Sequence, residues 1–117
     1  MITTDILYRG EDKTEIFILK DCSNNLIVFE DLVDCEAIVV VNKVVQQKYS
    51  KEEKEGYLTL LPVEDEENKC KLILTSAMTS EFPKGLMEIM FTMSLVDADY
   101  PVLGRKETVE MALYIVE

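Results

Sequence analysis

Two groups of carboxylates are the residues that come nearest to a metal site in this chain. Residues 64–67 read Glu-Asp-Glu-Glu, and Asp97 and Asp99 lie two positions apart. Calcium prefers such oxygen ligands, but neither group has the spacing of an EF-hand loop, and consecutive carboxylates cannot all point at one ion. We therefore expect solvated acidic loops and no resident metal, with calcium binding as the alternative.

The chain contains no histidine, and this excludes the commonest kinds of active site. A Ser-His-Asp or Cys-His arrangement needs an imidazole base, and most zinc and iron sites use imidazole as a ligand. The four glycines stand singly, so no Gly-rich phosphate-binding motif is present. With no tryptophan and five tyrosines, the chain also lacks the aromatic residues of a sugar cleft. We predict a protein that is not an enzyme and that takes no cofactor and no small-molecule substrate.

Three cysteines, Cys22, Cys35 and Cys70, lie far apart in the sequence. An odd number without a CxxC pair speaks against both a disulfide framework and a zinc site. Cys70 is in register with Leu72 and Leu74, as expected of a small buried hydrophobic residue. Reduced, structural thiols are therefore expected.

Charge is the clearest bulk property: 23 acidic and 12 basic residues give a net charge of −11. Such a surface repels phosphate backbones and anionic membranes, so we expect no nucleic-acid and no membrane partner. No apolar run approaches the ~20 residues that span a bilayer, and the first residues do not read as a signal peptide. The acidity either keeps the domain soluble or steers a basic protein partner to it.

The strongest structural pattern lies in residues 86–96 and 107–116, where apolar and polar residues alternate. Alternation with period two is typical of a half-buried strand. Residues 97–106 join the two runs and carry Pro101 and Gly104, so a long antiparallel hairpin is predicted. Two strands alone are marginally stable, and the hairpin therefore needs a sheet facing it.

The remainder of the chain supplies further strands. The expected strands cover residues 14–20, 26–29, 35–45, 57–63 and 70–74, with a short helical turn at 75–81. The polar residues 46–56 form either an exposed hairpin tip or a single helical turn. A helix is the alternative for residues 35–45, where Asp34 could cap it. At about ten residues per strand, the pattern predicts an all-β fold: one antiparallel immunoglobulin-like sandwich of seven or eight strands, with at most one short helical turn. One domain covers residues 1–117, of which 1–13 could form an N-terminal arm. Residues 6–8 could be a first edge strand or an arm that docks on a neighbour.

Four segments then point to a family. Residues 14–21 read Thr-x-Ile-x-Ile-x-Lys-Asp, 56–60 read Gly-Tyr-Leu-Thr-Leu, 71–76 read Lys-Leu-Ile-Leu-Thr-Ser, and 82–86 read Phe-Pro-Lys-Gly-Leu. In this order they resemble the small immunoglobulin-like domains of tailed-phage structural proteins, of the baseplate-upper-protein N-terminal, tail and head-fibre kinds. The likeness is one of strands and turns over nearly the whole chain. Asn24-Asn25 stands where those domains often carry Asp-Gly.

The resemblance implies a structural or assembly protein of the virion, made in the bacterial cytoplasm and present in several copies as a homo-oligomer or larger assembly. Its partners would be other virion proteins, bound through strand edges and apolar faces. The alternatives are an acidic binding or inhibitor module for a basic protein, and a calcium-dependent carbohydrate-binding sandwich. Loops and termini usually carry such contacts. The residues we expect to contact a partner are Ile6, Leu7, Tyr8, Tyr49, Tyr57, Met90, Tyr100, Val102 and Leu103.

Overall fold

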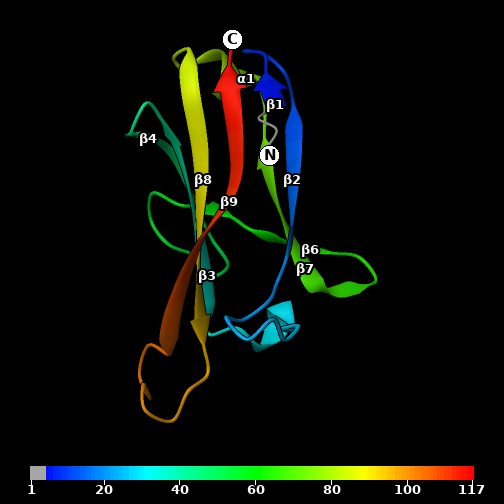
Figure 1. The fold of residues 1–117 in the computed structure, drawn as a ribbon, viewed down its shortest axis with the longest axis vertical. Coiled ribbons are helices and arrows are strands. Elements are labelled where there is room, and N and C mark those ends of the chain that lie inside the picture. Colours follow the sequence, from blue (N-terminus) through cyan, green and yellow to red (C-terminus); the bar gives the residue numbers. More distant parts are fainter. Residues whose placement is uncertain (1–4) are drawn as a thin grey trace.

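The computed structural model describes residues 5–117, apart from the side chains of residues 109–112. Within that range the chain forms nine strands and two short helical turns (Figure 1). The strands are β1 (Asp5–Leu7), β2 (Lys13–Ile18), β3 (Asp34–Val41), β4 (Val44–Ser50), β5 (Leu58–Thr59), β6 (Leu61–Val63), β7 (Glu66–Leu74), β8 (Gly85–Leu95) and β9 (Arg105–Val116). The turns are the 3-10 segment η1 (Phe29–Asp31) and the helix α1 (Ser76–Ser80).

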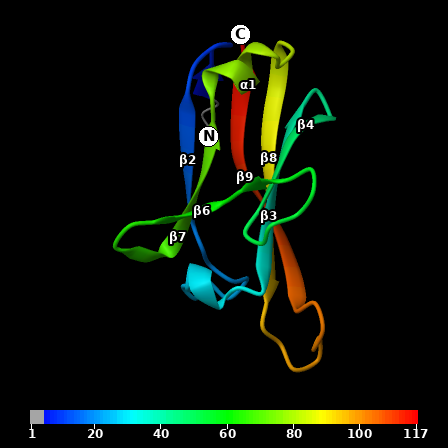
Figure 2. The same ribbon diagram turned by 180° about the vertical axis from the view of Figure 1, so that it is seen from behind.

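The strands form two sheets, which confirms an all-β sandwich. One sheet has the order β1-β9-β8-β3-β4-β5 and the other the order β2-β7-β6. Numbered along the chain, β2, β7 and β6 match strands B, E and D of a variable-type immunoglobulin sandwich, and β9, β8, β3 and β4 match G, F, C and C′. Strand β5 takes the position of C″ in the sheet order but pairs in parallel with β4. The predicted sandwich is therefore present, and Figures 1 and 2 show its two layers from opposite sides.

The predicted hairpin is the longest pairing of the structure. Strands β8 and β9 pair antiparallel from Gly85–Val116 to Leu95–Arg105, with one bulge between Ile89 and Met90. The alternating residues of β8, from Met87 to Leu95, all lie on the buried face. The inner residues of β3 and β7 face the same core, because side chains on a strand alternate between its two sides.

Several details of the predicted architecture are wrong. Asn42 and Lys43 adopt φ angles of 50° and 67° and form a two-residue turn, which divides the expected 35–45 strand into β3 and β4. Residues 46–50 therefore belong to β4 and not to a polar tip, and the helix alternative for residues 35–45 is excluded. The expected 57–63 strand is likewise divided into β5 and β6, which belong to different sheets. In addition, the expected 26–29 strand is absent, because Leu26 forms only an isolated bridge with Lys20 and Phe29 begins η1. With these changes residues 5–117 form nine strands instead of seven or eight.

The sandwich is also not purely antiparallel. Strand β1 pairs in parallel with β9, and β5 pairs in parallel with β4. Both are short edge strands, which a period-two pattern cannot assign to a neighbour. Residues 5–7 of the possible N-terminal arm are thus part of the sheet, while residues 1–4 lie outside the described range.

The core between the sheets is apolar, and the hydroxyl of its buried Tyr49 is hydrogen-bonded. The rings of Phe17 and Phe91 face each other across the sheets with centroids 5.2 Å apart. The hydroxyl of Tyr49 donates to the carbonyl oxygen of Ile73 at 2.6 Å. Burial raises the pKa of Tyr49 to about 12. Cys35 and Cys70 are buried free thiols, as expected, and Cys22 is an exposed one.

The short helix α1 confirms the predicted helical turn. Thr75 precedes it in extended conformation, and its side chain accepts a hydrogen bond from the backbone N–H of Met78. Such an N-cap satisfies one of the donors that a helix start leaves unpaired. Helix α1 and strand β1 lie at the end of the molecule that carries the C-terminus, and the β8–β9 loop lies at the other end (Figure 1).

Candidate functional site

The end of the sandwich opposite α1 is built from three loops. These are the connection of residues 21–33 before β3, the loop 51–57 after β4, and the loop 96–104 between β8 and β9. In the variable-type arrangement these are the connections B–C, C′–C″ and F–G, which lie at the same end of the sandwich. We call this region the loop end. The loop 96–104 extends furthest along the long axis of the molecule (Figure 1).

Loop 96–104 is held by its own hydrogen bonds at the base. The backbone N–H groups of Tyr100 and Gly104 donate to the carbonyl oxygens of Asp97 and Tyr100, each at 3.0 Å. Gly104 has a φ of 75°, and a Cβ there would lie 2.6 Å from the carbonyl oxygen of Leu95. Arg105 donates to Asp97 at 2.9 Å and to Glu107 at 2.5 Å. The base of the loop is therefore fixed by charge-assisted bonds and by a conformation that favours glycine.

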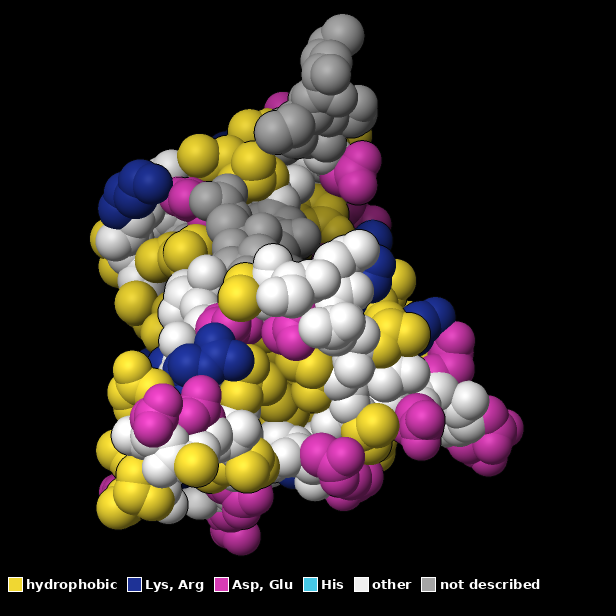
Figure 3. All heavy atoms as spheres, turned by 60° about the horizontal axis from the view of Figure 1, so that its bottom comes forward, with side chains coloured by type: hydrophobic (Ala, Val, Ile, Leu, Met, Phe, Trp, Pro, Cys, Tyr) yellow, Lys and Arg dark blue, Asp and Glu magenta, His cyan; other side chains and the backbone are white. Residues whose placement is uncertain are grey.

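The top of this loop is apolar and exposed. The exposed fractions are 78% for Val96, 53% for Tyr100, 84% for Val102 and 66% for Leu103. We call these four residues the apolar tip. A hollow of about 520 Å³ lies along residues 100–106. In the view that brings this end forward, hydrophobic side chains gather on one side with Asp and Glu side chains beside them (Figure 3).

The connection 21–33 packs beneath the tip. Its turn is closed by Asp21, whose carboxylate accepts hydrogen bonds from the backbone N–H groups of Ser23 and Asn25, both at 2.9 Å. The bond from Asn25 is the main reason that the pKa of Asp21 is lowered. Further along, Phe29 and Leu32 are buried in the core and anchor the segment. The backbone N–H of Val33 then donates to the carbonyl oxygen of Ser94 at 2.9 Å.

Cys22 also connects this segment to the base of the tip loop. A hydrogen bond from the Cys22 side chain is the largest cause of the lowered pKa of Glu107, and Arg105 lowers that pKa further. The side chain of Val33 lies close to Gly104, at 3.2 Å from the position that a Cβ there would take. The first and third loops are thus in direct contact.

Lys51 joins the second loop to the first. Its Nζ donates to the carbonyl oxygens of Glu30 and Leu32 at 3.1 and 2.7 Å, and it lies 5.3 Å from the ring centroid of Phe29. The positive charge of Lys51 thus offsets the partial negative charge of the carbonyl groups at the end of η1, and these bonds hold the start of loop 51–57 in place.

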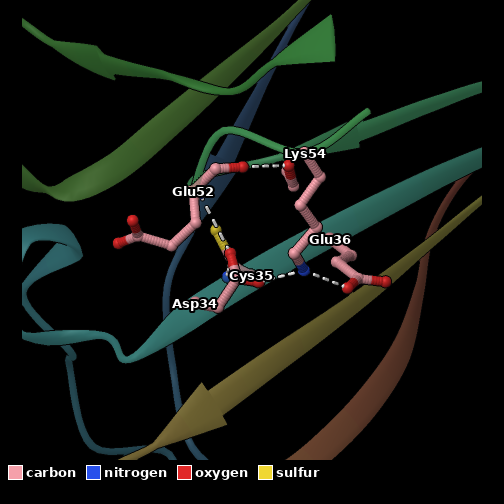
Figure 4. A network of polar contacts seen from close by, with 6 residues as sticks. Asp34, Cys35, Glu36, Glu52 and Lys54 are labelled. Carbon is pink, nitrogen blue, oxygen red and sulfur yellow. Dashed lines mark hydrogen bonds and ion pairs between the residues drawn. The ribbon is translucent and has the colours of Figure 1, made fainter. Parts of the chain in front are cut away.

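Asp34 and Lys54 hold the remainder of loop 51–57. Lys54 forms ion pairs with Asp34 and, at 2.5 Å, with Glu36, while the backbone N–H of Glu52 donates to Asp34 at 3.1 Å (Figure 4). Burial alone would raise the pKa of Asp34, but the hydrogen bonds from Lys54 and two backbone N–H groups outweigh it and lower the pKa. The same hydrogen bonds to Asp34 and Glu36 raise the pKa of Lys54. Tyr57 ends the loop, with Lys48 and Lys54 over its ring.

The loop end is strongly acidic. Its three loops carry eight carboxylates and two lysines. We call the carboxylates the acidic rim: Asp21, Glu30, Asp31, Glu52, Glu53, Glu55, Asp97 and Asp99. Both lysines, Lys51 and Lys54, are engaged in the contacts just described. The loop end therefore carries an excess of negative charge, although Asp97 is paired with Arg105 and the hollow at the tip is also lined by Arg105 and Lys106.

The residues expected to contact a partner fall in four places. Tyr57, Tyr100, Val102 and Leu103 lie at the loop end. Ile6 and Tyr8 are exposed near the opposite end, and Met90 is half-buried on the outer face of the six-stranded sheet.

Leu7 and Tyr49 require correction, because both side chains are only 2% exposed. Leu7 points inward from β1, and Tyr49 bonds across the core to Ile73. Neither side chain is available to a partner. Tyr49 was expected to lie in an exposed tip because the turn at Asn42–Lys43 was missed.

Sequence reasoning also missed part of the loop end. Val96 and Val33 belong to it, and Lys51, Lys54 and Asp34 hold it together. The useful signal was the strand order, since a variable-type sandwich brings the B–C, C′–C″ and F–G loops to one end. That order could be inferred only by locating the turn at Asn42–Lys43 and the break at Leu60 between β5 and β6.

No group of three or more Asp, Glu, Cys or His side chains in the described part of the chain could hold a metal ion. The carboxylate of Asp97 is engaged with Arg105, and residues 64 and 65 form the turn between β6 and β7. Among residues 5–117, no helix has the length and apolar character needed to cross a bilayer.

Comparisons with known proteins found no match to this chain among family models, curated proteins or solved structures. The resemblance to phage domains therefore stays a prediction, and the functional argument rests on the loop end itself.

Proposed function

We propose that this protein is a non-enzymatic assembly module that binds other proteins through its loop end. The observation that carries the proposal is the apolar tip: four large hydrophobic side chains exposed on a loop whose base is fixed by hydrogen bonds and ion pairs. Exposed apolar groups rimmed by polar residues mark interaction sites, and a fixed base lowers the entropy lost on binding.

The setting we propose is a tailed-phage virion, with other virion proteins as partners. The support is the resemblance of residues 14–21, 56–60, 71–76 and 82–86 to phage sandwich domains, together with the immunoglobulin-like strand order. An antibody against the chain should detect it in particles purified from the phage that encodes it. Its absence from such particles, with presence in the infected-cell lysate, would remove the virion setting and leave the binding module.

A second candidate is supported by the acidic rim. Eight carboxylates around an apolar tip suit the capture of a basic protein, as an inhibitor or immunity-type module would achieve it. Salt separates the two candidates. Capture of a basic partner weakens steeply as ionic strength rises, because screening shortens the range of the attraction to about 8 Å at physiological salt. Apolar assembly contacts should persist at high ionic strength.

The test is affinity capture with three immobilised proteins: the wild type, the double variant Val102→Asp, Leu103→Asp, and the control Val44→Asp. Val44 is 60% exposed but lies beside the Asn42–Lys43 turn, away from the loop end. We expect the wild type and Val44→Asp to retain a partner protein that the tip variant does not retain. Once purified, this partner should bind the wild type again. If no protein depends on the tip at either low or high salt, the proposed function is rejected.

A further inference from the structure

The outer face of the three-stranded sheet differs from the loop end in both charge and shape. Strands β2, β7 and β6 pair so that Ile16, Lys71 and Leu61 form one row across the sheet, beside a row of Ile18 and Lys69 and a row of Thr14 and Ile73. Beyond them Lys20 pairs with Leu26. We call this surface the lysine face. Its aliphatic residues are at least one-third exposed: Ile16, Ile18, Leu26, Leu61 and Ile73.

The lysine face is a basic region on an acidic protein. Lys69 is paired with Glu66 at 2.6 Å, at the end of the face where the β6–β7 hairpin begins. Lys20 and Lys71 form no ion pair with any residue in the described part of the chain. The central positions of β2 and β7 on this face carry no carboxylate. Two unpaired cations thus stand among exposed aliphatic side chains.

The lysine face and the loop end are complementary. One has aliphatic side chains with unpaired lysines, and the other has an apolar tip with unpaired carboxylates such as Asp31 and Asp99. Asp31 lines the same hollow as Val96, and Asp99 lies within the tip loop. Opposite charges around apolar contacts fix orientation and suppress other partners.

We propose that the loop end of one copy of this chain docks on the lysine face of a second copy. This inference rests on the proposed function and names one partner for it. The tip loop 96–104 and the sheet of β2, β7 and β6 are different parts of the molecule, although Leu26 of the connection 21–33 lies at the edge of the lysine face. The contact is therefore heterologous: each docked copy keeps one free tip or one free face. Heterologous contacts generate rings when the rotation closes and filaments when it does not.

The contact is small, because one loop tip meets a three-stranded sheet. Interfaces that bury less than about 1,200 Å² belong to the weak, transient class. Association is therefore expected to depend on concentration, with the mean mass rising between about 10 µM and 1 mM.

Salt alone is a poor test of this contact. Each copy carries a net charge of −11, so low ionic strength strengthens the overall repulsion between copies along with the local attraction. A charge exchange at fixed physiological salt separates the two effects.

The experiment uses light scattering over that concentration range with two double variants. The face variant carries Lys20→Glu and Lys71→Glu, and the tip variant carries Asp31→Lys and Asp99→Lys. All four side chains lie on the surface or are half-buried, and circular dichroism with thermal melting verifies that each variant folds. Lys84→Glu, an exposed lysine at the opposite end, is the charge control.

We expect the wild type and Lys84→Glu to gain mass with concentration, while each double variant alone stays monomeric. An equimolar mixture of the two double variants should form complexes again, because the basic tip then meets the acidic face. A wild type that stays monomeric up to about 1 mM, or an association that neither variant changes, overturns the inference.

These outcomes are distinct from failure of the proposed function. If the wild type is monomeric but still retains a partner through Val102 and Leu103, only the second copy is rejected. If tip-dependent capture fails while the charge exchange restores mixed complexes, self-association remains and binding to other proteins is rejected.

Discussion

The core and the apolar tip use the same kinds of side chain for opposite purposes. In the core, Phe17 and Phe91 pack against each other because two sheets face one another. At the tip, Val102 and Leu103 are exposed because the loop extends beyond the sheets that could cover it. An apolar residue therefore stabilises the fold only where a second layer meets it, and elsewhere it is available to a partner.

Truncating one residue in each region tests this comparison most directly. Phe91→Ala removes a ring that is 1% exposed and should lower the free energy of unfolding by about 3–5 kcal/mol. Val102→Ala should change it by less than about 0.5 kcal/mol, because this side chain is exposed. Urea denaturation followed by circular dichroism measures both. Equal losses for the two variants would show that the tip packs against the body of the protein in solution.

The base of the tip loop offers a second test. Gly104→Ala places a Cβ 2.6 Å from the carbonyl oxygen of Leu95 at a φ of 75°, and we expect a loss of about 2–3 kcal/mol. Gly56→Ala is the matched control, because Gly56 also has a positive φ of 81° but no atom within 4 Å of the added Cβ. The control should lose about 1 kcal/mol. If both variants unfold at the same urea concentration, the base of the loop is not fixed as described.

The hydroxyl of Tyr49 gives the stability of the core a dependence on pH. Tyr49→Phe leaves the Ile73 carbonyl without this donor and should cost about 1–2 kcal/mol at pH 7. In the wild type, the pKa of about 12 lies above the ordinary value of 10.0. A raised pKa contributes stability that is present below the ordinary pKa and is lost as pH rises through the folded value. The advantage of the wild type over the variant should therefore shrink between pH 10 and 12.

Denaturation of the two proteins over that pH range checks this prediction. Contributions that the two proteins share cancel, so the difference between the two curves isolates Tyr49. A constant difference would mean that the hydroxyl remains accessible to solvent.

The period-two pattern predicted the sandwich and its longest hairpin, because burial on one face of a strand imposes that period. It did not locate the turn at Asn42–Lys43. The 35–45 run contains six β-branched residues, four of them in a row, and these concealed the turn; neither turn residue is the glycine that usually marks a hairpin of this kind. The parallel pairings of β1 with β9 and of β5 with β4 were also not predictable, since pairing partners depend on the assembled sheets.

The candidate site was only partly predictable for a related reason. Tyr100, Val102 and Leu103 could be selected as a loop with exposed apolar residues. The contacts of Lys51 with Glu30 and Leu32, and of Lys54 with Asp34, join segments about 20 residues apart. Such contacts follow from the strand order and not from any local pattern.

Glu15 is an exception to the contrast between an apolar core and an exposed tip, because it places a carboxylate on the inner side of β2. It lies on β2 with its side chain on the same side as the buried Phe17, and its Oε1 is buried without a hydrogen-bond partner in the described part of the chain. Burial raises its pKa; Lys13 opposes this effect and Asp5 adds to it. Strand β2 is an edge strand, and an inward-pointing charge is one way in which edges avoid pairing with other chains.

Replacing this carboxylate should give the one gain in stability among these variants. Glu15→Gln is expected to stabilise the protein by up to about 1 kcal/mol at pH 7, because the amide avoids the cost of burying a charge. The raised pKa means that protonation relieves the wild type, so the gain should disappear as pH falls through the folded pKa of Glu15 toward 4.5. Thermal melts of both proteins from pH 7 to 4 measure the difference. A variant that melts lower than the wild type at pH 7 would show that the carboxylate has a stabilising partner, and the inner face of β2 would then follow the same rule as the core beside it.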